Sequence, residues 1–428
     1  WFSAKRRVGA RPVHPLAIHE LGLQRLVAKS ADGSHRIAVR YGLPPVKHPL
    51  PTAADVVVVG GGVMGTSTAF HLAEAGVNVV LIERGDLAGG SPSRAAGGVR
   101  ANFSDELNIS LGKRSLELFD QFHVRPGQGI DLHRSGYLFV LTDAAEVERF
   151  TATVALQNSL GVEAHLVDVE RACQLSPLLS PEGVLAAAWT PGDGHCAPES
   201  VVMGYARGAR AHAAVIITQL PVTDIVSSGG EITAVVTPEG AIATSCVINC
   251  AGAWSPQIAA MVEVDLPVTP YRRQLLITEP MAEPIDMTFT IEYGTSLYWH
   301  REGPGILTGF SDTTAPAGFG LASDPEFPAK LAELAEQRAP ALLDLGVQTG
   351  WTGLYEVTPD HNALLGEATT VSRFLYATGF SGHGFLQGPA VGEVLRDLYL
   401  GNTPFIDVSP LDVRRFESGE LRPEANIV

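Results

Sequence analysis

A glycine-rich turn between two short apolar runs is the feature that most constrains how this chain can fold. Residues 55–83 open with four consecutive valines, which predict a strand buried on both faces of a parallel sheet. A G-x-G-x-x-G turn, a helical stretch and a second apolar strand follow, and the unit ends at Glu83. Such a turn lets a pyrophosphate approach the backbone at a helix N-terminus, and a terminal acid suits a ribose hydroxyl. We therefore expect this unit to bind a dinucleotide, with the turn formed by Gly60, Gly62 and Gly65.

Charge is distributed unevenly along the 428 residues. The net charge of −16 disfavours nucleic acid as a partner, yet residues 1–54 carry nine Lys and Arg against Glu20 and Asp32. We expect this proline-containing segment to be an arm that contacts an acidic surface of the chain, of a second copy or of a partner subunit. The four cysteines lack metal-ligand spacing, so we expect no metal site and a reducing compartment, the cytoplasm. No apolar run approaches 18 residues, so we expect no transmembrane span.

Three later segments place further glycine turns beside strand-like runs. They are GGSPSRAAGGVR at 89–100, VINCAGAW at 247–254 and YATGFSGHGF at 376–385. Each turn would let backbone approach the same cofactor, although the first segment could also be a surface loop. After the last turn we expect a helix that begins near Pro389, because proline is favoured at the first helical position. The N-terminus of that helix would stabilise negative charge on a reduced cofactor ring.

With these segments the chain resembles the D-amino-acid-oxidase-like superfamily of flavoproteins, in the branch of sarcosine oxidase and the β-subunit of dye-linked proline dehydrogenase. The resemblance covers about residues 55–401 and includes the DGHCAP run and the LYEVTPDHNALLG stretch. It implies an α/β fold with a discontinuous, doubly wound, Rossmann-like FAD-binding domain and an α+β substrate-binding domain with a mainly antiparallel sheet. The implied division is an arm at 1–54, the FAD-binding domain at 55–136, 192–264 and 346–428, and the substrate-binding domain at 137–191 and 265–345.

The same resemblance implies how FAD is held. Relatives with a covalent flavin have His where this chain has Arg94, or Cys close to where it has Gly353, so we expect non-covalent FAD. Relatives that activate oxygen have Lys where this chain has Leu307 or Thr308, which favours a dehydrogenase. The residues expected to contact FAD are Gly60, Gly62, Val63, Met64, Gly65, Glu83, Arg84, Gly90, Ser91, Ser93, Arg94, Ala96, Gly97, Gly98, Val222, Ala251, Gly252, Trp254, Gly379, Phe380, Gly382, His383, Gly384 and Phe385.

The activity implied by the resemblance is oxidation of a carbon–nitrogen bond to an imine by hydride transfer to FAD, with O2 or another electron acceptor. The substrate would be a sarcosine-like, N-methyl or proline-like amino acid or secondary amine. Arg100 is the first candidate to bind its carboxylate and Arg273 the second. Leu386 replaces a lysine that binds this group in relatives. The other catalytic candidates are His383, Tyr298, Trp299 and Tyr355, with Trp351 as a further aromatic.

Two other functions stay open at this point. Within enzymes, the alternative is a glycine or D-amino-acid oxidase. From another class, the alternative is a non-catalytic flavoprotein subunit or an assembly factor that uses FAD structurally. A nicotinamide-dependent dehydrogenase ranks last, because such an enzyme has no need of the downstream glycine turns.

Overall fold

The computed structural model describes residues 26–29, 35–38 and 49–426. Residues 1–49 and 50–428 form two separate units. In the first unit, β1 (Leu26–Lys29) and β2 (His35–Ala38) form an antiparallel hairpin, with Leu26 opposite Ala38. Residues 1–25, 30–34 and 39–48 of the expected arm lie outside the described residues, and residues 50–54 belong to the second unit. No helix within the described ranges is long and apolar enough to cross a membrane.

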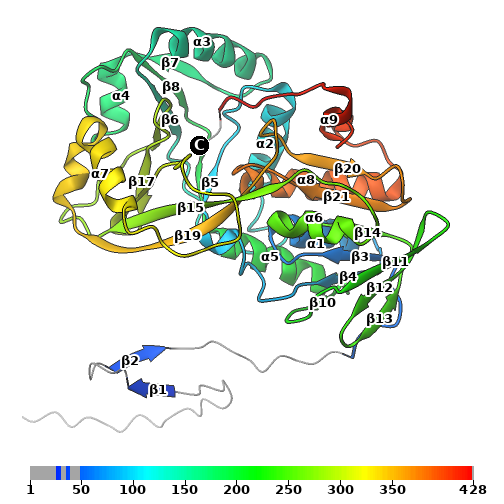
Figure 1. Cartoon of the computed structure of the whole chain (residues 1–428). Helices are drawn as coiled ribbons and strands as arrows, with labels where there is room; N and C mark the ends of the chain where they lie inside the picture. Colours follow the sequence, from blue (N-terminus) through cyan, green and yellow to red (C-terminus); the bar gives the residue numbers. More distant parts are fainter. Residues whose placement is uncertain (1–25, 30–34, 39–48, 427–428) are drawn as a thin grey trace, which may run out of the picture. The chain divides into compact units, whose positions relative to one another are not determined.

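A six-stranded sheet is the centre of the second unit (Figure 1). All neighbouring strands are parallel except the last pair, which is antiparallel. The four valines of β3 alternate between two cores: Val56 and Val58 face one side, and Val57 and Val59 face the other. The strand is thus buried on both faces, as the unbroken apolar run predicted. The strand order is β10 (Val215–Ile217), β4 (Val79–Ile82), β3 (Val56–Val59), β14 (Val247–Asn249), β21 (Phe374–Thr378) and β20 (Leu364–Glu367).

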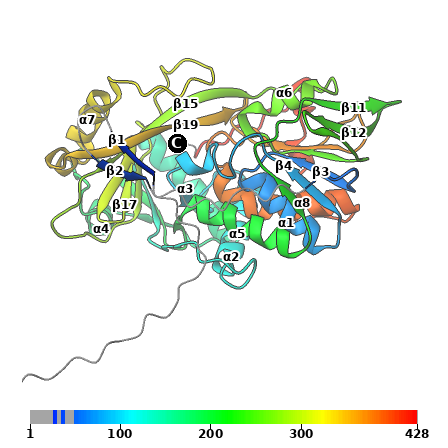
Figure 2. The same ribbon diagram turned by 90° about the horizontal axis from the view of Figure 1, so that it is seen from below.

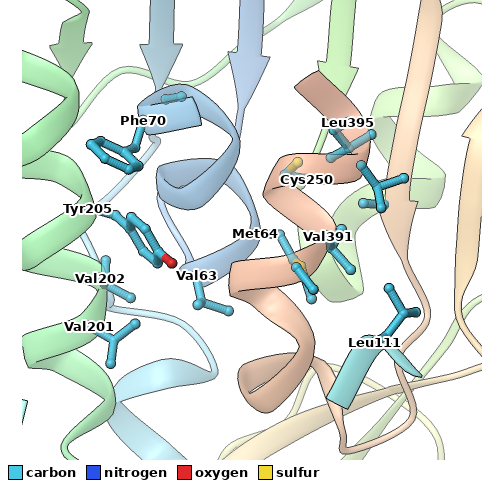
Figure 3. Close-up of a cluster of buried hydrophobic side chains, with 14 of the residues drawn as sticks. Val63, Met64, Phe70, Leu111, Val201, Val202, Tyr205, Cys250, Val391 and Leu395 are labelled. Atoms are coloured by element: carbon cyan, nitrogen blue, oxygen red, sulfur yellow. The ribbon is translucent and has the colours of Figure 1, made fainter. Parts of the chain in front are cut away.

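Helices cover one face of this sheet. Figure 3 shows the apolar side chains between them: Phe70 and Tyr205 fill the space between α1 and α5, and Val391 and Leu395 line α8. Their burial binds the sheet to the helical layer, at roughly 1.5–3 kcal/mol for each large side chain. The helices of this layer are α1 (Val63–Glu74), α2 (Glu106–Asp120), α5 (Pro198–Ala211) and α8 (Gly384–Leu400).

The other face of the sheet packs on a smaller layer. A three-stranded antiparallel sheet contributes Ile225, Ile232, Val235 and Ile242 to the core that contains Val57. A short helix that follows β14 completes this layer. The elements are β11 (Asp224–Ser228), β12 (Glu231–Thr237), β13 (Gly240–Ala243), η2 (Gly252–Trp254) and α6 (Ser255–Ala260).

An eight-stranded sheet forms the other half of the second unit. Neighbouring strands are antiparallel except β16 and β6, which are parallel. Figure 2 shows two long strands, β15 and β19, running side by side from this sheet toward η2 and α6. The order is β19 (Val347–Val357), β15 (Thr269–Thr278), β18 (Gly305–Gly309), β17 (Tyr298–Glu302), β16 (Phe289–Glu292), β6 (Tyr137–Leu141), β8 (Ala186–Thr190) and β7 (His165–Val167).

The remaining elements are short or lie at the margins of the two sheets. Helices pack on the eight-stranded sheet, where Phe150, Leu331 and Trp299 are buried. A two-stranded ribbon forms a small sheet of its own, separate from the two large sheets. These elements are β5 (Gly98–Val99) and β9 (Gly194–His195), α3 (Ala144–Ser159), α4 (Val169–Leu175), α7 (Phe327–Arg338), α9 (Arg415–Ser418), η1 (Pro92–Arg94), η3 (Pro340–Asp344) and η4 (Ser409–Leu411).

Two details differ from the sequence-based expectation. The helix expected to begin near Pro389 begins at Gly384, so this proline lies inside α8. Its ring removes only one N–H, close to the helix start, where few intrahelical hydrogen bonds precede it. β19 falls in the segment 346–428 that we assigned to the FAD-binding domain, yet it is the edge strand of the eight-stranded sheet. The rest of the domain division stays a prediction.

Candidate functional site

A cavity of about 670 Å³ lies at the carboxyl ends of β3, β4 and β14. Sites for small molecules and cofactors in proteins commonly have volumes of this order, about 300–1,000 Å³. In open parallel sheets, ligands bind outside the carboxyl ends of the strands where the strand order reverses. The fold therefore places a cofactor-sized space where the glycine turn was expected to bind one.

The glycine turn forms the floor of this cavity, and two of its glycines have no room for a side chain. Gly60 has φ +115°, and a Cβ there would lie 2.3 Å from the carbonyl oxygen of Cys250. A Cβ at Gly65 would lie 1.9 Å from the carbonyl oxygen of Gly60. Gly62 precedes α1 without any side-chain cap, and the first turn of α1 contains no acid. The free N–H groups and the helix dipole therefore suit a pyrophosphate.

Glu83 stands at the end of β4 in the wall of the cavity. Its carboxylate accepts hydrogen bonds from the N–H groups of Gly61, at 2.6 Å, and Gly85, at 2.7 Å. These bonds fix the carboxylate beside the turn and leave further lone pairs for a ribose hydroxyl. Nearby, the Arg84 guanidinium lies 3.7 Å from the centre of the Trp254 ring, which stacks on Phe319. The loop between β18 and α7, which contains Phe319, thus reaches the rim of the cavity.

A second, smaller chamber of about 110 Å³ adjoins the cavity. The two share six residues as common walls. Three arginines, three tyrosines and a histidine line the chamber, and no Asp or Glu is among its described lining residues. The shared residues are Arg94, Ala95, Arg273, Tyr355, Gly382 and Phe385, and the residues lining only the chamber include Arg100, Tyr137, Tyr298, His383, Phe289 and Leu386.

The two candidate arginines differ in what their guanidinium groups already bind. Arg100 donates to the carbonyl oxygens of Asn102 and Asn426, and its guanidinium lies 4.2 Å from the centre of the Phe103 ring. Burial lowers its pKa, although the group stays charged at any ordinary pH. At Arg273 only Nη1 is engaged, with the carbonyl oxygens of Arg272, at 3.0 Å, and Asp312, at 3.4 Å. Its buried Nε has no partner among the described residues, and its guanidinium lies 5.2 Å from the Tyr355 ring. Arg273 therefore has more free donors to offer a ligand.

The C-terminal residues of the described chain help to hold Arg100. The Glu424 carboxylate accepts hydrogen bonds from the backbone N–H of Ser104, at 2.9 Å, and from the amide of Asn108, at 3.0 Å. This contact brings the carbonyl of Asn426 beside Arg100. A segment more than three hundred residues away in sequence thus completes one wall of the chamber.

His383 contributes a neutral imidazole. Both of its ring nitrogens are buried without a partner among the described residues. Burial lowers its pKa to about 3, with smaller contributions from Arg100 and His361. Burial raises the phenol pKa values of Tyr137, Tyr298 and Tyr355. At neutral pH the chamber therefore has cationic arginines and neutral hydrogen-bonding groups.

Most of the expected site residues line one of these two spaces. Gly65, Ser93, Gly379 and Phe380 stand behind the walls, in the turns that shape them. The expected residues that line the cavity alone are Gly60, Gly62, Val63, Met64, Glu83, Arg84, Gly90, Ser91, Val222, Ala251, Gly252, Trp254 and Gly384. Those that line the chamber alone are Ala96, Gly97, Gly98, Arg100, Tyr298 and His383, and those that line both are Arg94, Tyr355, Gly382 and Phe385.

The expectation for Trp299 was wrong. Its ring is fully buried in the core of the eight-stranded sheet, and its Nε1 donates to the Ser176 hydroxyl at 3.2 Å. Tyr298 lines the chamber, and side chains alternate along a strand, so its neighbour must point the other way.

Sequence reasoning also missed several walls of the site. Tyr137 and Phe289 line the chamber as a stacked pair, with ring centres 4.4 Å apart. Their strand-like surroundings gave no sign that two distant strands, β6 and β16, pair in parallel. Glu356 lines the cavity as well, and the acid next to Tyr355 in a matching segment was a signal that could have identified it.

A family profile described as FAD dependent oxidoreductase (DAO) matches residues 55–398. The chain is 28% identical to the mitochondrial dimethylglycine dehydrogenase of Rattus norvegicus over 426 residues, which cover 94% of this chain and 50% of that protein. It is 28% identical to the mitochondrial sarcosine dehydrogenase of Homo sapiens over 384 residues, covering 86% of this chain and 42% of that protein. The chain thus spans about half the length of these curated relatives.

Among solved structures, the L-proline dehydrogenase of P. horikoshii is similar to this chain with a TM-score of 0.83 and 33% sequence identity. The match covers 87% of this chain and 100% of that one. The groups that line the large cavity fit the cofactor that the family profile names. A side-chain-free turn at an uncapped helix N-terminus suits a pyrophosphate, and a fixed carboxylate suits a ribose.

Proposed function

The chain belongs to the DAO family of FAD-dependent oxidoreductases, and we propose that it oxidises the carbon–nitrogen bond of a small amino acid that carries a secondary amine. FAD is the cofactor of this family. The proposed substrates are sarcosine-like, N-methyl or proline-like amino acids. Relatives named as sarcosine, dimethylglycine and L-proline dehydrogenases support this class.

The chamber is the observation that carries the proposal. It adjoins the cofactor cavity, its volume of about 110 Å³ admits only a small molecule, and it is lined by three arginines without any described acid. A guanidinium binds both oxygens of a carboxylate in one plane. A small, positively charged space beside the cofactor therefore selects a small carboxylate over a neutral amine.

We assign the substrate carboxylate to Arg273. Its Nη1 binds the carbonyls of Arg272 and Asp312, but its buried Nε lacks a partner among the described residues, whereas both Nη atoms of Arg100 already bind backbone carbonyls. A carboxylate would satisfy the free donors of Arg273 and remove the cost of leaving a buried polar atom unpaired. Arg100, which also lines the chamber, would add positive charge, and both arginines act on the phenol of Tyr355.

The amine would face the neutral groups of the chamber. Bound FAD would supply the hydride acceptor, and the amine must be uncharged when the carbon bonded to it loses the hydride, because the nitrogen lone pair forms the imine bond. His383 has an unpartnered ring nitrogen that can accept a hydrogen bond from an N–H group, and its low pKa keeps it from repelling the substrate as a cation. The tyrosine and phenylalanine rings exclude water from the reacting bond.

FAD is proposed to bind without a covalent link. Arg94 and Gly353 occupy the positions that carry the link in the covalent flavoproteins that the sequence resembles. The two positions lie against each other, since a Cβ at Gly353 would lie 3.0 Å from that of Arg94. Neither residue has a nucleophile that could bond to the flavin ring. Acid precipitation of the protein is expected to leave the yellow colour in the supernatant.

Anaerobic reduction of the flavin tests the proposed function. The yellow protein is mixed with sarcosine, L-proline, dimethylglycine, glycine and D-alanine in turn, and the loss of flavin absorbance is followed before air is admitted. Bleaching by a secondary amino acid supports the proposal. Bleaching only by glycine or D-alanine would instead indicate a primary amino-acid oxidase, and a flavin that stays oxidised with a wide panel of amines would indicate a structural cofactor.

We favour a dehydrogenase over an oxidase. Leu307 is buried in β18, where oxygen-activating relatives have a lysine on the matching strand, and Leu386 lines the chamber. Without a cation there, the reaction of reduced flavin with O2 loses electrostatic assistance. After bleaching, we expect the absorbance to return slowly in air and rapidly with an artificial dye.

The basic segment 1–54 is proposed to contact a second copy or a partner subunit, and the cytoplasm stays the predicted compartment. The support is the excess of positive charge in this segment against a strongly negative remainder. Removal of residues 1–49, a separate unit, is expected to change the elution volume of the assembly without lowering FAD content.

A further inference from the structure

Glu356 stands in the cofactor cavity at a point where two strand-end turns meet. Glu356 is the second-last residue of β19, and it lines the cavity. Oε2 lies 3.2 Å from the hydroxyl oxygen of Thr378, at the end of β21, and Oε1 lies 3.5 Å from the backbone nitrogen of Phe380. A Cβ at Gly252 would lie 3.2 Å from Oε2, so the turn after β14 also touches this group.

The hydrogen bonds around Thr378 indicate that Glu356 carries a proton. A hydroxyl group has one hydrogen to donate. The Thr378 hydroxyl lies 3.0 Å from the carbonyl oxygen of Gly252, which can only accept, and 3.2 Å from Oε2 of Glu356. If Thr378 donates along the shorter contact, its oxygen lone pair faces Oε2. That second contact is a hydrogen bond only when Oε2 bears the proton.

The charges around Glu356 favour the same protonation state. Burial raises its pKa to about 7, and the Thr378 hydroxyl and the backbone N–H groups of Phe380 and Gly379 offset only part of that shift. No Lys, Arg or His of the described residues acts on the carboxyl. Cys250, which follows β14, is a titratable group that interacts with Glu356. Burial raises the pKa of its thiol to about 12, so the thiol is neutral.

The other charged or titratable groups of the elements around Glu356 face elsewhere. On its own strand, Tyr355 faces the chamber; Arg273 of β15 lies over the Tyr355 ring. His383, which precedes α8, has a pKa near 3 and is neutral. Tyr376 of β21 hydrogen-bonds to the N–H of Val413 on the far side of the sheet. Arg84, Arg94 and Arg273 also line the cavity, but no cation of the described residues shifts the pKa of Glu356.

We propose that Glu356 is a neutral carboxylic acid in the cofactor-free protein, and that ionisation of this group weakens the binding of FAD. The pyrophosphate of FAD brings two negative charges into a cavity that the Glu83 carboxylate already lines, and an ionised Glu356 would add a further one in a poorly screened space. FAD binding is therefore coupled to a proton on Glu356. The inference depends on the cofactor, which family membership gives, and not on the proposed substrate.

The coupling has a definite sign and size. Below the pKa of the cofactor-free protein, Glu356 is already protonated and the affinity for FAD is constant. Above it, each binding event must take up a proton, so Kd rises by up to about tenfold per pH unit. The rise ends only where the higher pKa of the FAD-bound state is reached.

Titration of the apoprotein with FAD tests the proposal. Kd is measured from the quenching of flavin fluorescence between about pH 6 and about pH 9, a range in which the pyrophosphate does not titrate. For the wild type we expect a constant Kd up to about pH 7 and a rise of about tenfold per unit above it. Glu356→Gln, which keeps the shape and the neutral charge, should bind as tightly at the lowest pH and show a flat profile. Glu336→Gln, at an exposed glutamate of α7, is the matched control and should follow the wild type.

Two results would overturn the proposal. One is a Glu356→Gln profile that rises with pH in parallel with the wild type, since another group would then be responsible. The other is a Glu356→Gln variant that is folded but binds FAD at least tenfold more weakly at the lowest pH. If the variant does not fold, calorimetry of the wild type in buffers of different ionisation enthalpy decides: about one proton should be taken up per FAD above the pKa, and none below it. A proton uptake of zero throughout refutes the coupling.

Discussion

Replacement of Arg273 by methionine gives the sharpest test of how the chamber recognises its substrate. Methionine keeps most of the length of the side chain and fills a similar apolar volume, but it removes the guanidinium with its unpartnered Nε. A carboxylate bound there would make two charge-assisted hydrogen bonds, each contributing about 1.5–3 kcal/mol. Arg100 remains in the chamber and offsets part of the loss. We therefore expect a net cost of about 3 kcal/mol, which is a fall of about 100-fold in kcat/KM.

The assay is rapid mixing with substrate under anaerobic conditions, followed through flavin absorbance. The loss should appear mainly as a higher Kd for L-proline or sarcosine, with a smaller change in the limiting rate of reduction. Pyrrolidine and dimethylamine, which lack the carboxylate, serve as paired probes. The wild type should prefer each amino acid over its amine, and Arg273→Met should lose most of that preference.

Arg272→Met is the matched control for this substitution. Arg272 is the neighbour of Arg273 on β15, and it bonds instead to the carbonyl of Ala322 and to Asp324. Its replacement should leave the preference for the carboxylate unchanged. If Arg273→Met retains the full preference for L-proline over pyrrolidine while Arg100→Met loses it, the carboxylate is bound by Arg100 and the assignment is wrong.

Three further predictions concern the cofactor, the fold and the chamber wall. Gly65→Ala should abolish FAD content after purification, because the new Cβ would lie 1.9 Å from a backbone oxygen; an alanine variant with full flavin absorbance would contradict this. Arg415→Met should lower the free energy of unfolding by about 3–5 kcal/mol in urea titrations, since it leaves Asp360 buried and unpaired; a loss below 1 kcal/mol would be inconsistent with a buried ion pair. Glu424→Gln should raise the KM for L-proline several-fold with little change in FAD content; an unchanged KM would show that the C-terminal segment does not position Arg100.

The sequence predicted the parts of the site that depend on local chemistry. The turn after β3 needed glycines because any side chain would strike backbone, and Glu83 followed directly from the end of the next strand. The strand of four valines was predicted with the bounds that β3 has, because an unbroken apolar run is typical of a strand buried on both faces. Local patterns of this kind are visible because the forces that set them act within a few residues.

Contacts between distant segments could not be predicted in the same way. The sequence cannot show that Asn426 binds the guanidinium of Arg100, because the two lie 326 residues apart along the chain. That contact changed which arginine is free for a ligand. The prediction for Trp299 was wrong for a related reason. Tyr298 and Trp299 are neighbours on β17, and only the pairing of this strand decides which of the two side chains faces the chamber. Proline is favoured at the first position of a helix, but Pro389 lies inside α8, so the packing of the whole helix outweighs this local preference.

The position of β14 has a consequence for how the protein is made. Val247 pairs with Val57 on one side and with Phe374 on the other, so the centre of the sheet joins three segments that leave the ribosome far apart in time. Parallel pairings of this kind close long loops before they contribute contacts, and they form slowly. The cofactor cavity takes its walls from all three segments, as far along the chain as Phe385. A nascent chain therefore cannot form the whole cavity until residues up to about Phe385 have been synthesised, and during that time the apolar strand β3 depends on chaperones or on early helical packing for protection.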